Sequence, residues 1–70
     1  MNIKYFSDTD TALLEFSGKN VNETREISEN IYIDLDVEGN LVSMTVEHAR
    51  EVAQLPDLSY QQIEKEKILA

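Results

Sequence analysis

The sequence contains no cysteine, a single histidine, one proline and two glycines. Without cysteine, the chain can form neither a disulfide framework nor a thiolate nucleophile or thiolate metal site. The amino terminus lacks the apolar core of a signal peptide, and no apolar run approaches the length needed to span a membrane. We therefore expect a cytoplasmic protein with no membrane partner.

Positive charge is also scarce, since six Lys and Arg stand against fourteen Asp and Glu, giving a net charge of -8. Nucleic-acid binding draws its affinity from Lys and Arg that displace counterions, so this chain is expected to repel phosphate backbones. A basic protein is a more plausible partner. The same acidic balance is also typical of proteins in which it serves only solubility.

Seventy residues are enough for one domain but not for a thick core. At this length only about 60 % of the surface of the unfolded chain is buried on folding. Some apolar surface is therefore expected to stay exposed unless a second copy or another protein covers it.

The clearest pattern lies between residues 31 and 46, where two alternating runs meet at a turn that contains Gly39. Successive side chains of a strand point to opposite faces of a sheet, so the pattern predicts a hairpin with one apolar and one acidic face. The turn Asp36-Val37-Glu38-Gly39 fits a type I turn followed by a glycine bulge. The apolar face comprises Ile31, Ile33, Leu35, Val42, Met44 and Val46, and the other face contains Tyr32, Asp34, Asp36, Ser43, Thr45 and Glu47.

Three further strands are predicted before this hairpin. Residues 2–6 and 12–16 alternate, with Leu13 on the outer face, and the polar segment 21–27 fits an edge or lightly covered strand. Its connection to Ile31 has either two residues, which places Ser28 opposite Ile31, or three, which places Ile27 there. We favour the three-residue turn Ser28-Glu29-Asn30, with Ile27 on the buried face and Asn30 able to adopt positive φ.

After residue 46 the period changes to that of a helix. Apolar Ala49, Val52 and Ala53 share one face, and Pro56 ends the helix. A capping box at Ser59 and Gln62 predicts a second short helix. The predicted fold is α+β: an antiparallel four- to five-stranded meander sheet with one C-terminal helix packed on one face, in a single domain over residues 1–55, and a short helix in the tail over residues 56–70.

The order and spacing of several short motifs over residues 1–55 resemble a bacterial family of small proteins, domain of unknown function 2283. Some members look like partners of small toxin-like proteins, so the resemblance implies an antitoxin-type role. The chain departs from the family pattern at Leu13, where an aromatic residue is common, and at His48 and Arg50, where Asp and Ser often open the helix. The matching residues are Tyr5, Thr9-Asp10-Thr11, Leu13-Leu14-Glu15-Phe16, Glu23-Thr24-Arg25-Glu26-Ile27, Ile33-Asp34-Leu35-Asp36, Gly39 and Val42.

Two patterns suggest chemistry only weakly. Asp34-x-Asp36-x-Glu38-Gly39 resembles the first half of a calcium loop, but the twelfth position is Thr45 and strands flank the loop, so the hairpin explains it better. His48 has neighbouring carboxylates but no nucleophile, second histidine or phosphate-binding loop, so a solvent-facing histidine is expected. We expect neither an enzyme nor a metal or other cofactor.

Six carboxylates are concentrated between residues 23 and 38, against the single Arg25. They fit an acidic patch that steers a basic partner, and they equally fit charges that protect sheet edges from pairing. We predict a non-enzymatic interaction module that binds a basic protein, as an antitoxin-like partner, and the alternative is a structural homo-oligomer, a dimer with no other ligand. The predicted contact residues are Leu13, Tyr32, Asp34, Asp36, Tyr60 and Ile63.

Overall fold

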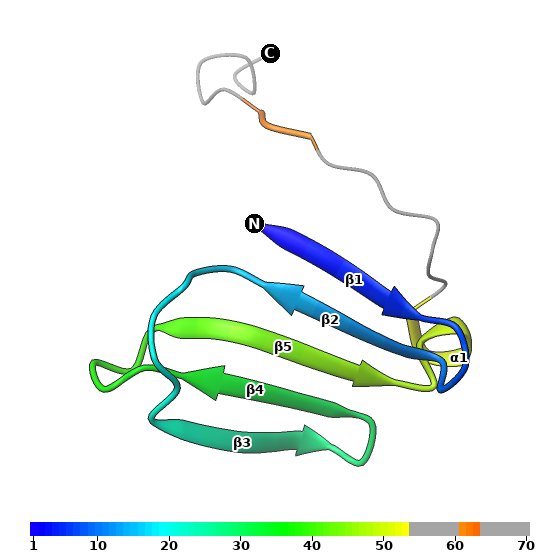
Figure 1. Ribbon diagram of the computed structural model, residues 1–70, viewed down its shortest axis with the longest axis horizontal. Coiled ribbons are helices and arrows are strands. Elements are labelled where there is room, and N and C mark those ends of the chain that lie inside the picture. Colours follow the sequence, from blue (N-terminus) through cyan, green and yellow to red (C-terminus); the bar gives the residue numbers. More distant parts are fainter. Residues whose placement is uncertain (54–60, 64–70) are drawn as a thin grey trace.

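A computed structural model of the protein describes residues 1–53 and 61–63. Within these ranges the chain forms five strands and one short helix, coloured along the sequence in Figure 1. The elements are β1 (Asn2–Phe6), β2 (Thr11–Glu15), β3 (Glu23–Ser28), β4 (Ile31–Leu35), β5 (Leu41–Glu47) and α1 (Ala49–Ala53). The expected α+β fold with an antiparallel sheet is confirmed.

The spatial order of the strands is β1-β2-β5-β4-β3. Strands β3, β4 and β5 follow one another as in a meander, but β5 returns to pair with β2, and the chain crosses to the far edge between β2 and β3 (Figure 1). The apolar β5 thus occupies the centre. The polar β3 lies at an edge of the sheet, and all six of its residues are exposed. This confirms the first of the two predictions for this segment, an edge strand.

The predicted register of β3 was wrong at its end. Ser28, not Ile27, pairs with Ile31, because a bulge interrupts the ladder between Glu26 and Ser28. Ile27 is the extra residue of this bulge, and its side chain is 59% exposed instead of buried. Asn30 does not have positive φ; its carbonyl accepts a hydrogen bond from the amide of Glu47 at 2.7 Å.

The turn between β4 and β5 confirms the prediction for Gly39, which has φ 86° and donates its amide to the carbonyl of Asp36 at 3.0 Å. Asp36 itself is buried in this turn. Its carboxylate accepts hydrogen bonds from the amides of Glu38, at 2.9 Å, and Asn40, at 2.8 Å. Such side-chain to backbone bonds favour a tight turn over further strand.

Helix α1 begins without a capping side chain of its own, because His48 stands at the N-cap with φ 54°. Asp10, in the turn between β1 and β2, supplies the cap from outside the helix. Its carbonyl accepts the amide of Ala49 at 2.9 Å, and its carboxylate accepts the amide of Arg50 at 3.2 Å. The hydroxyl of Tyr5 donates to the same carboxylate at 2.5 Å. The first turn of the helix is therefore fixed to the opposite end of the chain.

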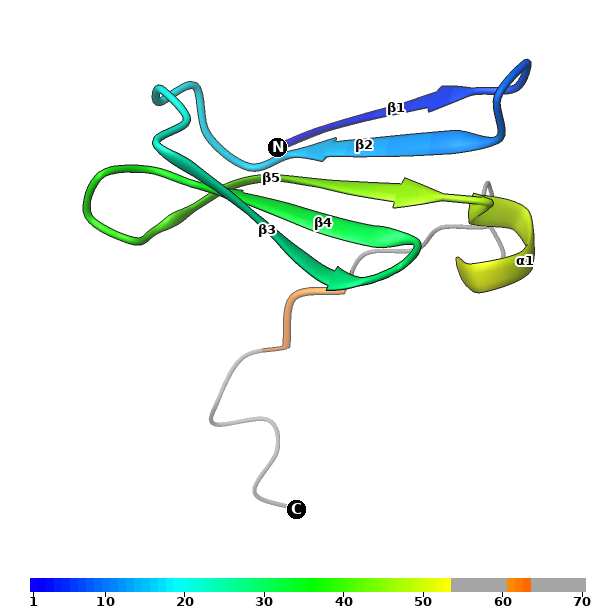
Figure 2. The same ribbon diagram turned by 90° about the horizontal axis from the view of Figure 1, so that it is seen from below.

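The helix packs on one face of the sheet at one end, beside β5 (Figure 2). Ala12, Val46 and Ala49 form the buried cluster beneath it. Of the three residues predicted to face the sheet, only Ala49 is buried. Val52 is 42% exposed, and Ala53, the last residue of α1, is exposed as well.

Most of the predicted tail helix lies outside the described residues. The part that is described, residues 61–63, has no helical assignment. None of the helices that the structure describes is long and apolar enough to cross a membrane.

The strand register sorts the side chains between two faces. The inner face, on which α1 packs, is apolar except at β3, and the outer face is mostly polar. The inner face contains Ile3, Tyr5, Ala12, Leu14, Glu23, Arg25, Ile31, Ile33, Leu35, Val42, Met44 and Val46, and the outer face contains Asn2, Lys4, Phe6, Thr11, Leu13, Glu15, Thr24, Glu26, Tyr32, Asp34, Ser43, Thr45 and Glu47.

Candidate protein-binding surface on the outer face

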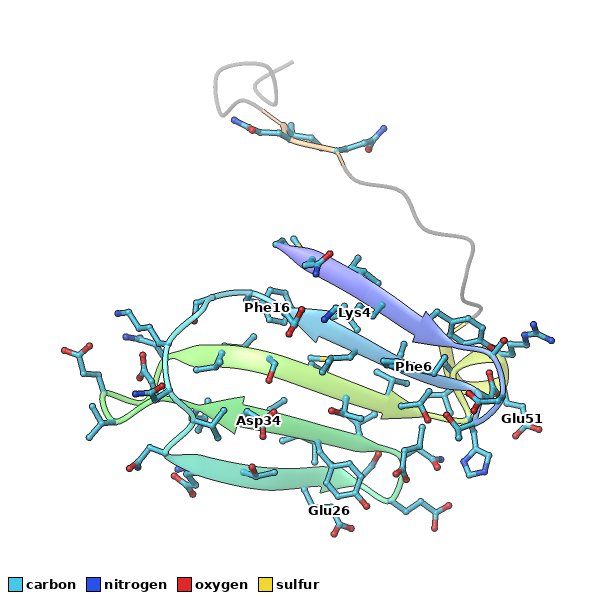
Figure 3. The ribbon with its side chains drawn as sticks, viewed as in Figure 1. Lys4, Phe6, Phe16, Glu26, Asp34 and Glu51 are labelled. Atoms are coloured by element: carbon cyan, nitrogen blue, oxygen red, sulfur yellow. The ribbon has the colours of Figure 1, made fainter. Side chains whose placement is uncertain are left out.

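The centre of the outer face is a row of side chains that crosses all five strands. Cross-strand pairing places Lys4, Leu13, Thr45, Tyr32 and Glu26 side by side in this order. Figure 3 labels the two ends of the row, Lys4 on β1 and Glu26 on β3. Neighbouring strands lie about 4.8 Å apart, so Leu13 and Tyr32 are separated by about two strand spacings.

Three carboxylates surround Tyr32, and we call these four residues the Tyr32 cluster: Tyr32, Glu26, Glu29 and Glu47. Glu26 is directly opposite Tyr32 on β3, and the Tyr32 hydroxyl lies 3.5 Å from the carbonyl of Glu29. The negative charge of Glu47, partial burial, and then the charges of Glu26 and Glu29 raise the pKa of the Tyr32 phenol above its ordinary value. The ring thus lies in a negative potential.

No cation neutralises this cluster in the part of the chain that the structure describes. The ion pairs there join Lys4 to Glu15 at 3.4 Å, Lys19 to Glu38 at 3.9 Å, and Arg25 to Glu23 at 2.8 Å. None of them includes a carboxylate of the Tyr32 cluster. The negative potential is therefore open to a cation from another molecule.

Asp34 lies in the next row of the outer face and belongs to a hydrogen-bonded ladder. The hydroxyl of Thr24 on β3 donates to one carboxylate oxygen, and the hydroxyl of Ser43 on β5 donates to the other, both at 2.6 Å. Asp34 is labelled on β4 in Figure 3. Its charge remains on the outer face, while its oxygens join three strands.

The predicted contact residues are only partly brought together. Leu13, Tyr32 and Asp34 share the outer face. Asp36 does not, because it turns inward to cap the β4–β5 turn and is 5% exposed. Ile63 is 64% exposed outside the sheet. Tyr60 lies outside the described residues.

The sequence prediction did not place Glu47 in the site, whereas Glu26 and Glu29 were among the six carboxylates of the predicted acidic patch. Glu47 continues the alternation of Ser43 and Thr45 on β5, so its outer-face position was readable from the sequence. Its closeness to Tyr32 depends on the pairing of β4 with β5, and that of Glu29 depends on the two-residue turn, which was the less favoured of the two predicted connections. The sequence therefore indicates the face on which Glu47 lies, but not that Glu47 and Glu29 both lie beside Tyr32.

His48 is exposed, as expected. Its Nδ1 lies 3.0 Å from the side-chain oxygen of Asn30, in the turn between β3 and β4. Its carbonyl accepts the amides of Glu51 and Val52, each at 3.0 Å. The residue thus connects the β3–β4 turn to the start of the helix, which is a structural role.

Residues 2–50 match the model of a family that is described as a protein of unknown function, DUF2283. The chain belongs to this family. The match begins at the first residue of β1 and ends within α1, so it covers all five strands of the sheet. Neither the search of curated proteins nor the search of solved structures gave a match.

Proposed function

We propose that this DUF2283 protein is a non-enzymatic interaction module that acts in the cytoplasm and binds a basic protein through its outer face, as the antitoxin-like half of a pair. The observation that carries the proposal is the Tyr32 cluster, an aromatic ring among three carboxylates with no cation from the described residues. The antitoxin-like character comes from the family resemblance, and the basic partner comes from the charge.

A basic side chain gains two interactions at this cluster. A Lys or Arg placed over the Tyr32 ring makes a cation–π contact and at the same time approaches the carboxylates of Glu26 and Glu47. Tyrosine is also enriched at the centres of protein interfaces, where its ring buries area and its hydroxyl keeps a hydrogen bond. Leu13 adds apolar surface in the same row.

The acidic charge of the chain supports the same partner over longer distances. A net charge of -8 attracts a basic protein before contact and raises the association rate at low salt. Binding of this kind weakens as salt is added, because ions screen charges that lie more than about 8 Å apart at physiological ionic strength.

The test is retention of proteins from native lysate on the tagged full-length chain at low and moderate salt, followed by mass spectrometry. We expect one small basic protein that is lost as the salt concentration rises. Glu47→Lys should reduce its retention at least about tenfold, since losing a close charge pair costs more than about 1.4 kcal/mol.

Glu38→Lys is the matched control. It makes the same charge change at the far end of β4, on an exposed side chain in the turn to β5. Equal losses with both variants would show that only net charge matters and would contradict a site at Tyr32. An acidic retained protein, or retention independent of salt, would reject the basic partner.

Co-expression then tests the antitoxin-like part. The retained protein alone is expected to slow growth, and the wild-type chain to restore it, whereas Glu47→Lys restores it poorly. A retained protein that leaves growth unchanged would remove the antitoxin role and leave the interaction module.

A further inference from the structure

The two faces of the sheet carry different charge. On the strands, the outer face has one basic residue against four acidic residues, whereas the inner face has one of each sign. The charged residues are Lys4, Glu15, Glu26, Asp34 and Glu47 on the outer face, and Glu23 and Arg25 on the inner face. Two copies of this acidic chain can therefore approach through their inner faces with little repulsion.

The inner face also has an apolar row that is not fully buried. Ile3, Leu14, Met44 and Ile33 lie side by side across four strands, and each remains partly exposed. Among the described residues, α1 is the only helix over this face, and it reaches only one end of it (Figure 2). The row is thus a contiguous apolar surface of the kind that marks an interface.

Helix α1 covers only one end of the inner face, and the height of the helix above the uncovered part is close to the thickness of a second sheet. A helix is about 10–12 Å thick with its side chains, and packed sheets lie about 10 Å apart. A second sheet packed on the inner face beside α1 therefore extends about as far from the first sheet as the helix does. The helix then lies against one end of the second sheet. The resulting arrangement is an aligned β-sandwich.

The edge strand β3 makes this face self-complementary. Arg25 lies in the row of Ile33, and Glu23 lies in the next row, beside Leu35. A two-fold axis that runs across the strands between these two rows exchanges them. Within each copy Arg25 already pairs with Glu23 at 2.8 Å. The two-fold axis places Arg25 of each copy opposite Glu23 of the second copy, so the two pairs meet in a symmetric cluster of four charges with no net charge.

We propose that a second copy of this chain docks on the inner face, giving a two-fold dimer whose apolar core is the row of Ile3, Leu14, Met44 and Ile33. In the dimer both acidic outer faces point away from each other. The dimer does not require the basic partner proposed above, and it leaves the Tyr32 cluster free to bind one.

The test measures the oligomeric state of the purified full-length chain by sedimentation velocity over a range of concentrations, with no other protein present. We expect a dimer. Met44→Lys should raise its dissociation constant at least about tenfold, because it buries an unpaired charge at the interface. Thr45→Lys, the next residue on β5 but on the outer face, should change it by less than about twofold.

A second set of variants keeps the test valid if Met44→Lys does not fold. Arg25 and Glu23 lie on an exposed edge strand, so changing them leaves the core intact. Arg25→Glu should weaken the dimer, and the double exchange Glu23→Arg with Arg25→Glu should restore it. Circular dichroism checks the fold of each variant.

Two outcomes would overturn the proposal. A wild-type chain that stays monomeric at high micromolar concentration would show that another protein or residues 54–70 of the same chain cover the inner face. A dimer that Thr45→Lys dissociates and Met44→Lys does not would place the contact on the outer face.

Discussion

At the scale of single residues, Asp10 joins the turn between β1 and β2 to the start of α1. One carboxylate accepts the Tyr5 hydroxyl and the Arg50 amide, residues that are 45 positions apart in the chain. These hydrogen bonds, that from Tyr5 most strongly, hold the pKa of Asp10 below its ordinary value. The Arg50 guanidinium also lies 5.6 Å from the centre of the Tyr5 ring, so the three side chains form one contact between β1 and α1.

This contact predicts a pH dependence. Because the pKa of Asp10 is lower in the folded chain, its carboxylate stabilises the fold above pH about 4, and this contribution is lost as the pH falls through the folded pKa. The melting temperature of the wild type should therefore exceed that of Asp10→Asn at neutral pH, and the gap should close in acid. A gap that is constant with pH would contradict this role.

The Tyr32 cluster makes a second prediction at this scale. Glu47 is the largest cause of the raised pKa of Tyr32, so Glu47→Gln should move that pKa down toward its ordinary value of about 10. Phenolate absorbance during a titration to high pH measures the shift, with Tyr32→Phe identifying which phenol titrates. No change would mean that the negative potential at Tyr32 has another source.

At the scale of elements, the turns decide where each strand ends. The β4–β5 turn combines the buried Asp36 carboxylate with a left-handed residue, Gly39. The β3–β4 turn instead uses a bulge that exposes Ile27 and brings Glu29 to Tyr32. Both turns thus shape the outer face as well as the sheet.

Gly39 offers a direct test of the first turn. Its φ of 86° is unfavourable for a residue with a Cβ, although nothing lies within 4 Å of the added atom. Gly39→Ala should therefore lower the free energy of unfolding by about 1 kcal/mol, measured by denaturant titration. Gly18→Ala is the control, since that position is equally open and is not left-handed, and it should leave stability the same or slightly higher. Equal losses would contradict the conformational explanation.

At the scale of the whole molecule, the core is thin. Its buried apolar residues are Ala12, Leu35, Val42, Val46 and Ala49, and no large side chain among the described residues is completely buried. This is the expected result for a chain of 70 residues, whose surface is large for its volume. Each buried methyl group therefore carries a large share of the stability.

Val46→Ala tests this dependence, because Val46 is 5% exposed beneath α1. It should lower the free energy of unfolding by about 2 kcal/mol through lost burial and the cavity left behind. Val37→Ala removes the same atoms from a side chain that is 80% exposed and should change stability by less than about 0.5 kcal/mol. A similar loss at both positions would argue against the core described above.

The sequence by itself determined the strands and their faces, because alternation of apolar and polar residues is a local property. Ile31, Ile33, Met44 and Val46 lie on the predicted face, and Gly39 has the predicted left-handed conformation. It also determined the acidic character of the surface.

Only the tertiary structure decided which strands meet and which residues gather. The pairing of β5 with β2 and the capping of α1 by Asp10 each join segments that are distant in the chain. The bulge at Ile27 changes the register of β3 by one residue. Local propensity does not encode such choices, since alternative pairings bury similar apolar residues. The inward turn of Asp36 and the gathering of Glu47 with Tyr32 follow from those pairings, so they appear only in the folded molecule.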